Sequence, residues 1–168
     1  VYESGATYYI VCTFDSNLNK VVIAYRDSDN SSYGTAVVGT VSGTAISFGT
    51  PVVFESASVS SKGITFDSNL NKVVIAYSDA GNSGYGTAIV GTVSGTSISF
   101  GSPVVFASAD TQNVSTTFDS ASNKVVIAYR DVGNDNYGTA IVGTVSGTAI
   151  SFGSEAVFES GFTPGTSC

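Results

Sequence analysis

Short apolar and polar blocks follow one another along this chain, and the same blocks occur three times. A lysine precedes the apolar run Val-Val-Ile-Ala-Tyr at residues 21–25, 73–77 and 125–129, and a polar loop follows each run. A short continuous apolar run bounded by turn formers is typical of a strand buried on both faces. We find no segment with the 3.6-residue period of an amphipathic helix. The pattern therefore predicts an all-β protein.

The blocks recur at a constant interval of 52 residues. Thr-Phe-Asp-Ser begins at Thr13, Thr65 and Thr117, with no insertion or deletion between the copies. The chain is therefore predicted to be one repeat domain over residues 1–168. Its units span about residues 5–56, 57–108 and 109–160, and residues 161–168 start a further unit.

Each unit is predicted to contain four antiparallel strands. In the first unit these are a strand ending near Phe14 and strands at residues 20–27, 33–41 and 45–54. Pro51 lacks an N–H, which places the fourth strand at an edge or bulge. Four strands with a period near 50 residues are typical of a β-propeller blade, so we expect three blades, with the apolar second strand lining the propeller interior. The expected core residues are Val21, Ile23, Val73, Ile75, Val125 and Ile127.

Three units do not make a closed propeller, which needs about four to eight blades. We therefore expect self-association, or further repeats, to complete the ring. A threefold fold, either a β-trefoil or a β-prism, is the structural alternative.

Four motifs of the first unit carry a family resemblance. They are Val-Val-Ile-Ala-Tyr-Arg-Asp at residues 21–27, Tyr-Gly-Thr-Ala at 33–36, Val-Gly-Thr-Val-Ser-Gly-Thr at 38–44 and Ser-Phe-Gly-Thr-Pro-Val-Val-Phe at 47–54. They resemble the tandem repeats of large bacterial and bacteriophage surface proteins, and the resemblance covers essentially the whole chain. It implies a β-propeller fold and an extracellular or virion-surface location.

The composition excludes several classes of function. The net charge is −7, which disfavours nucleic acid, and no apolar run is long enough for membrane insertion. The chain has no histidine, so a Ser-His-Asp or Cys-His site is impossible, and two cysteines are too few for a zinc site. The carboxylates recur in every unit, as structural residues do. We therefore expect no enzyme activity and no cofactor.

The recurring aspartates are interpreted as turn residues. Asp15, Asp67 and Asp119 suit Asx turns, whose side chains accept hydrogen bonds from nearby backbone N–H groups. A calcium site at the loop after Asp27 would need more oxygen ligands than this loop supplies in the other units, where Gly81 and Gly133 replace Asp29. We therefore expect no metal site, and a turn with Asn30, Asn82 and Asn134 in special backbone geometry.

The units differ most in the link from each fourth strand to the next first strand. In a propeller this link and the loop at residues 28–32 emerge on one face, which would form a varied recognition surface. Drift in unconstrained loops would also produce variation. Aromatic rings at this face could stack on sugars or pack internally, and arginine is replaced by Ser78 in the second unit. The candidate ligand-binding residues are Arg26, Asn30, Tyr33, Asn82, Tyr85, Arg130, Asn134 and Tyr137.

Cys12 and Cys168 are disulfide candidates, because they occupy the same position of the repeat. A bridge would join different chains in a split propeller and would be internal in a threefold fold. Taken together, the sequence predicts a non-catalytic binding module for attachment to a glycan or receptor on a virion or cell surface. The alternative is an architectural repeat spacer in a large fibre or adhesin.

Overall fold

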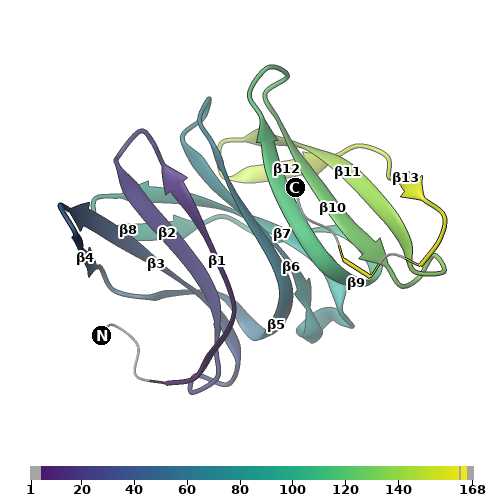
Figure 1. Ribbon diagram of the computed structural model, residues 1–168, viewed down its shortest axis with the longest axis horizontal. Helices are drawn as coiled ribbons and strands as arrows, with labels where there is room; N and C mark the ends of the chain where they lie inside the picture. The colour runs from purple at the N-terminus through teal and green to yellow at the C-terminus, as the bar shows by residue number, and fades with distance from the viewer. Residues whose placement is uncertain (1–4, 163, 166–168) are drawn as a thin grey trace.

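The computed structural model describes residues 5–162 and 164–165, and nearly all of its regular structure is antiparallel β-sheet (Figure 1). Apart from one 3-10 turn, η1 (Ala80–Asn82), every regular element of this part of the chain is a strand. The first unit contains β1 (Thr7–Asp15), β2 (Lys20–Asp27), β3 (Tyr33–Ser42) and β4 (Ala45–Phe48). Strand β5 (Val52–Asp67) crosses from the first unit into the second, which also contains β6 (Lys72–Asp79), β7 (Tyr85–Ser94) and β8 (Ser97–Phe100). Strand β9 (Val104–Asp119) crosses into the third unit in the same way, and this unit also contains β10 (Lys124–Asp131), β11 (Tyr137–Ser146), β12 (Ala149–Phe152) and β13 (Ala156–Glu159). The all-β prediction is confirmed.

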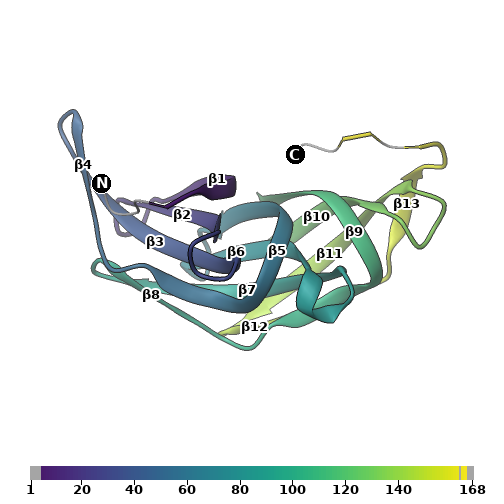
Figure 2. The ribbon, with the colours of Figure 1, turned by 90° about the horizontal axis from the view of Figure 1, so that it is seen from below.

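The strands form one continuous path of antiparallel pairs. Its order is β1-β2-β3-β5-β6-β7-β9-β10-β11-β12, with β4, β8 and β13 paired to β3, β7 and β11. Strands β8 and β12 lie on the opposite side of the molecule from β1 (Figure 2). The ends of the path do not pair with each other, so the described strands do not close into the barrel that a β-trefoil contains.

The links between units are strands rather than loops, which corrects one expectation. The first half of β5 pairs with β3, and its second half pairs with β6, so a single 16-residue strand crosses from one unit to the next. The fourth strand is also interrupted. The Gly49 amide donates to the Val38 carbonyl across 2.9 Å, and pairing to β3 resumes at Val52, beyond the N–H-less Pro51.

The hydrophobic core lies between neighbouring units. Each unit presents a forward face to the unit after it and a backward face to the unit before it. In the first unit the forward face consists of Val22, Ala24, Ala36, Val38 and Phe54, all buried. They pack against the backward face of the second unit, which consists of Val73, Ile75, Ile89, Val93 and Ile98. The residues 52 positions later in each set form the second interface in the same way.

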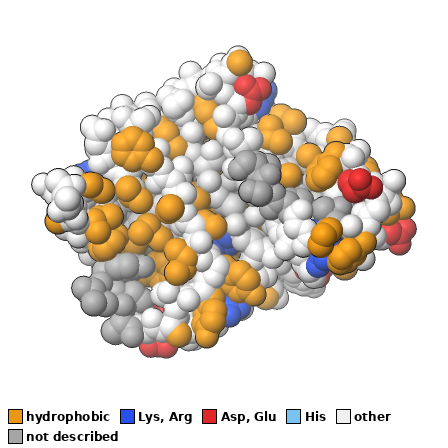
Figure 3. Space-filling model, viewed as in Figure 1, with side chains coloured by type: hydrophobic (Ala, Val, Ile, Leu, Met, Phe, Trp, Pro, Cys, Tyr) orange, Lys and Arg blue, Asp and Glu red, His pale blue; other side chains and the backbone are white. Residues whose placement is uncertain are grey.

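The second strands are buried on both faces only where units lie on both sides. All residues of β6 except its first are buried, whereas β10 alternates between buried and partly buried side chains. Val73, Ile75, Val125 and Ile127 are fully buried, as predicted, but Val21 and Ile23 are only partly buried. No described unit precedes the first one, which explains the difference. Apolar side chains gather over the part of the surface formed by the first unit (Figure 3).

The position of the second strand corrects another expectation. Strand β2 pairs with β1 on one side and with β3 on the other, so it is central in its unit, and the first strand lies at the border of the unit. The second strand is continuously apolar because neighbouring units bury both of its faces, not because it lies at an edge of its unit.

The tyrosine that ends each apolar run packs in the core. Tyr77 and Tyr129 are fully buried, and their hydroxyls donate to Glu55 across 3.0 Å and to Glu155 across 2.8 Å. Burial and the neighbouring glutamate raise the pKa of both phenols. Ala107 stands where Glu55 does one unit earlier, so Glu155, which replaces a proline of the other units, supplies the missing acceptor.

We expect Ile75→Ala to lower the free energy of unfolding by about 2–5 kcal/mol, because the removed atoms leave a cavity in a fully packed interface. Chemical denaturation followed by far-UV circular dichroism measures this. Leu70→Ala is the control, since Leu70 is 41% exposed, and it should cost less than about 0.5 kcal/mol. A loss at Ile75 as small as that of the control would contradict the packing.

Candidate functional site

The first strand of every unit carries a β-bulge at the same position of the repeat. Pairing with the second strand shifts between Tyr8 and Val11 in β1, and between Ser60 and Gly63 in β5. The same shift occurs in β9 opposite residues 128–130. Bulges re-aim side chains and are common next to binding and active sites.

The bulged residues have unusual backbone conformations. Tyr9, Ser61 and Asn113 have φ angles of 51°, 43° and 52°. These values lie in the left-handed region, which most residues other than glycine and asparagine avoid. Such strain persists only where the surrounding structure imposes it, and it is concentrated at functional sites.

The three bulges converge around two cavities. The first has a volume of about 250 Å³ and is lined mainly by Tyr9, Ile10, Ser61, Lys62, Asn113 and Val114. The second, of about 230 Å³, continues along the same strands past Cys12, Ile64 and Thr116. Val11, Lys62 and Val114 line both cavities. We call the bulge residues and these cavities the bulge site.

The bulge site coincides with the strongest difference between the units. At residues 8–12, 60–64 and 112–116, no two units share a residue at any of the five positions. The threonine that follows is the same in all three units. Sequence reasoning located this variable segment but proposed residues of the adjacent loops. Position-by-position comparison of the three units would have identified Tyr9, Ser61, Lys62 and Asn113.

Positive charge is buried at the bulge site. Lys62 is 6% exposed, and its Nζ has no hydrogen-bond partner among the described residues. Lys62 Nζ lies 5.3 Å from the centre of the Tyr9 ring, and the Arg26 guanidinium lies 4.9 Å from the same ring. Burial, followed by repulsion from Arg26, lowers the pKa of Lys62 to about 7.

The alternation of arginine between units has a structural explanation. Arg26 is the cross-strand partner of Tyr8, and Arg130 is that of Gln112, to which it donates a hydrogen bond. In the second unit a small pair, Ser60 and Ser78, occupies the same two positions. Of the candidate ligand-binding residues, Arg26 is brought against the bulge site through Tyr9, and Arg130 also lies 5.0 Å from the ring of Phe162.

The remaining candidates lie in the adjacent turns and line neither cavity. Asn30, Asn82 and Asn134 are not the left-handed residues of these turns, which corrects that expectation. The positive φ angles fall one or two positions later, at Ser31, Ser32, Ser83, Gly84, Asp135 and Asn136. Tyr33, Tyr85 and Tyr137 are half-buried at the start of β3, β7 and β11. The turns do lie beside the links, since the Ser28 amide donates to the Ala6 carbonyl across 3.1 Å.

The recurring aspartates organise turns. Asp15 accepts hydrogen bonds from the Asn17 and Leu18 amides, both across 3.0 Å, and Asp67 and Asp119 do the same in their units. Asp27 accepts from the Asn30 amide across 3.2 Å, while Asp79 and Asp131 accept from the glycines two residues on. Within the described residues, no three His, Cys, Asp or Glu side chains lie close enough together to hold a metal ion.

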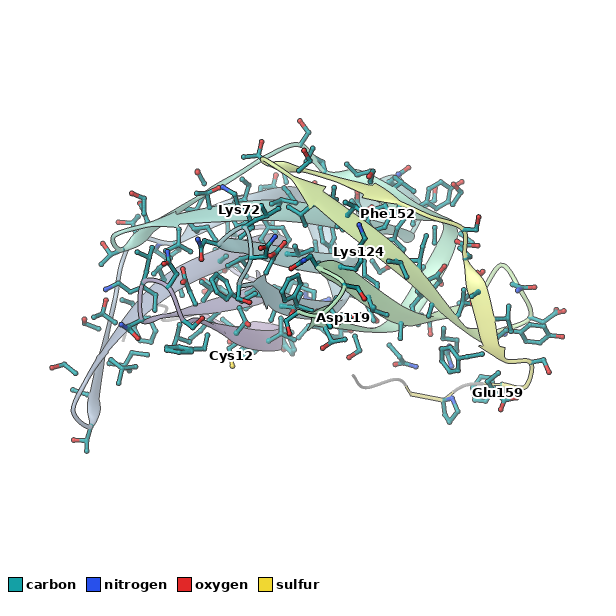
Figure 4. All side chains as sticks on the ribbon, turned by 90° about the horizontal axis from the view of Figure 1, so that it is seen from above. Cys12, Lys72, Asp119, Lys124, Phe152 and Glu159 are labelled. Atoms are coloured by element: carbon teal, nitrogen blue, oxygen red, sulfur yellow. The ribbon has the colours of Figure 1, made fainter. Side chains whose placement is uncertain are left out.

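Of the two disulfide candidates, only Cys12 lies among the described residues. Cys12 is exposed on β1 and forms no disulfide with a described residue; its sulfur lies outside the ribbon in Figure 4. Cys168 lies outside the described residues. The proposed bridge therefore stays a prediction.

Comparison of this chain with protein-family models, with curated proteins and with solved structures finds no match. The resemblance to bacterial and bacteriophage surface repeats therefore stays an expectation. No helix in the described part of the chain is long and apolar enough to cross a membrane.

The buried lysine predicts an unusual pH dependence of stability. Lysine has an ordinary pKa of 10.5, and that of folded Lys62 is about 7, so the unfolded chain binds more protons between these values. Stability should therefore rise with pH, by roughly 1–2 kcal/mol from pH 7 to pH 9, and fall again as pH returns to 7. Urea unfolding at several pH values measures this, and Lys62→Met should remove the rise. The same slope in wild type and variant would show that Lys62 is not its source.

We expect EDTA to leave the melting temperature unchanged, because the loop aspartates are already engaged by backbone amides. Differential scanning calorimetry with EDTA and then with excess calcium tests this. A fall on chelation that calcium reverses would instead identify Asp27, Asp79 and Asp131 as metal ligands.

Proposed function

We propose that this chain is a non-catalytic binding module whose ligand occupies the bulge site. Its three units act as blades of a β-propeller that attaches to a glycan or receptor on a virion or cell surface. The observation that carries the proposal is the convergence of three left-handed bulges, each with different side chains, on shared cavities.

The place of the variation favours selection over drift. The differing residues lie within the paired strands β1, β5 and β9, not in open loops where substitutions are freely tolerated. Tyr9 and Ser61 adopt left-handed conformations that cost energy, and the flanking residues of all three units are nearly the same. A common scaffold with a locally diversified centre is what a recognition surface requires.

The arrangement of strands supports the propeller. Each unit is a four-stranded antiparallel layer whose first strand faces the first strands of its neighbours, and whose fourth strand lies at the opposite border. Apolar faces of successive layers pack against each other. Successive blades of a propeller relate to one another in this way.

The chemistry of the bulge site favours a sugar that carries a carboxylate. Lys62 Nζ and Arg26 Nε are buried without a hydrogen-bond partner among the described residues, and burial of unpaired positive charge is unfavourable. The lysine has a flexible four-carbon stem and lines both cavities, so its ammonium group can turn toward an anion in either one. Tyr9 offers an aromatic surface beside these cations.

The alternative function is an architectural spacer without a ligand of its own. The near-identity of the strands outside the bulge site and the compensation of Ala107 by Glu155 both serve packing and favour this reading.

A glycan array with neutral, sialylated and uronic-acid-containing saccharides tests the proposal. We expect binding to the acidic members, weakened roughly tenfold or more by Lys62→Met, because a buried charge pair is lost. Lys124→Met is the matched control: it makes the same change of charge, but Lys124 Nζ bonds to Thr144 across 2.9 Å, away from the cavities. Absence of binding across the array would favour the spacer. Equal losses of affinity in the two variants would show that the ligand binds outside the bulge site.

A further inference from the structure

We propose that a second copy of this chain docks on the open faces of the first and third units, so that two copies form one closed six-unit ring. The proposal rests on the propeller arrangement inferred above, and it names the partner and the surfaces. The two junctions of the ring would be identical, each joining the third unit of one copy to the first unit of the other.

The internal interfaces provide the template for this junction. Forward and backward faces meet twice within the chain, between the first and second units and between the second and third. The forward-face and backward-face residues defined above are identical in the two interfaces, at positions 52 residues apart. The outer part of the first unit's backward face and the forward face of the third unit meet no other described unit. These two faces are the halves of a third interface of the same kind.

The backward face of the first unit is open at its outer end. Val41 is 54% exposed, whereas its equivalents Val93 and Val145 are 8% and 7% exposed. Ile46 is 45% exposed, whereas Ile98 and Ile150 are both 4% exposed. Tyr25 and Val37, further inward on this face, are already fully buried. Docking therefore takes place around the turn between β3 and β4.

The forward face of the third unit is open at the matching place. Val142 is 45% exposed, whereas its equivalents Val38 and Val90 are 0% and 1% exposed. Val38 packs in the same cluster as Val93 and Ile98, so Val142 is suited to pack against Val41 and Ile46 of a second copy. None of these side chains is charged, and the exposed surface would be buried as in the internal interfaces.

Three equivalent glycines differ in the space around them, according to whether another described unit packs against them. A Cβ added to Gly49 would lie 1.9 Å from the carbonyl oxygen of Thr96 in the next unit, and one added to Gly101 would lie 2.0 Å from that of Thr148. Only glycine therefore fits the internal interfaces at this position. At Gly153 the nearest such atom is the Val142 carbonyl oxygen of its own unit, 3.8 Å away. Gly153 has the space for a side chain in the isolated chain, and a docked copy would place Thr44 over it.

In a ring built only from copies of these 168 residues, the three units of each copy set the number of copies. Closed propellers have about four to eight blades. Two copies of three units give six, which falls within this range, whereas three copies give nine, which does not. Identical head-to-tail junctions close a ring when the rotation between units allows it.

Sedimentation equilibrium of the 168-residue chain tests the proposal. We expect a species of twice the 17.1 kDa chain mass. Gly153→Val and Ile46→Glu should each weaken the dimer by roughly a hundredfold or more, because a side chain blocks the junction or a charge is buried in it. Leu70→Glu is the control: Leu70 is 41% exposed on the second unit, outside both open faces, and the variant should dimerise as the wild type does.

A matched internal variant separates docking from folding. Gly153→Val should leave the melting temperature of the dilute monomer unchanged, whereas Gly101→Val should lower it, because Gly101 meets the Thr148 backbone within the chain. A wild-type chain that stays monomeric would overturn the proposal, as would a dimer that Gly153→Val and Ile46→Glu do not weaken. Larger open assemblies would overturn the closed ring. Lys62→Met should not affect dimerisation, so the ring and the ligand site can fail independently.

Discussion

Burial of two apolar faces on every unit is the constraint on which the rest of the structure depends. A unit of four strands is a single layer, and its central strand carries apolar side chains on both sides. Such a layer cannot bury the apolar side chains of both faces by itself, so its stability comes from packing against the units before and after it. The middle unit shows this most clearly, since β6 is buried almost throughout. The partly exposed faces of the first and third units follow from the same constraint.

The continuous strands β5 and β9 serve this packing. A strand that pairs with β3 at one end and with β6 at the other fixes the position of one unit relative to the next through backbone hydrogen bonds. The bulge lies within the second half of this strand, where one inserted residue shifts the pairing with β6. The bridging strand therefore sets the relation between units and also directs variable side chains into a common space.

The repeat tolerates change where a replacement can restore a lost interaction. Tyr77 bonds to Glu55 of the preceding unit, but Ala107 cannot serve Tyr129 in the same way. Glu155, from the other direction along the chain, accepts the hydrogen bond instead. A buried hydroxyl without an acceptor is costly, which explains why the loss of one glutamate accompanies the gain of another.

The sequence by itself determined the strands, the turns and the 52-residue unit, because each depends on residues close together in the chain. The Asx turns at Asp15 and its equivalents need only the next three residues, and the apolar runs at residues 21–25 and beyond mark strands covered on both faces. The sequence also located the variable segment. The tertiary structure alone decided that this segment is a strand with a bulge, because its conformation depends on pairing with two different units. It also decided that Lys62 and Tyr9, 53 residues apart, share one cavity, and that Val21 and Ile23 are less buried than Val73 and Ile75. Burial of a repeated side chain depends on whether a neighbouring unit covers it. Identical residues in different units can therefore differ in burial, and their sequence does not show this difference.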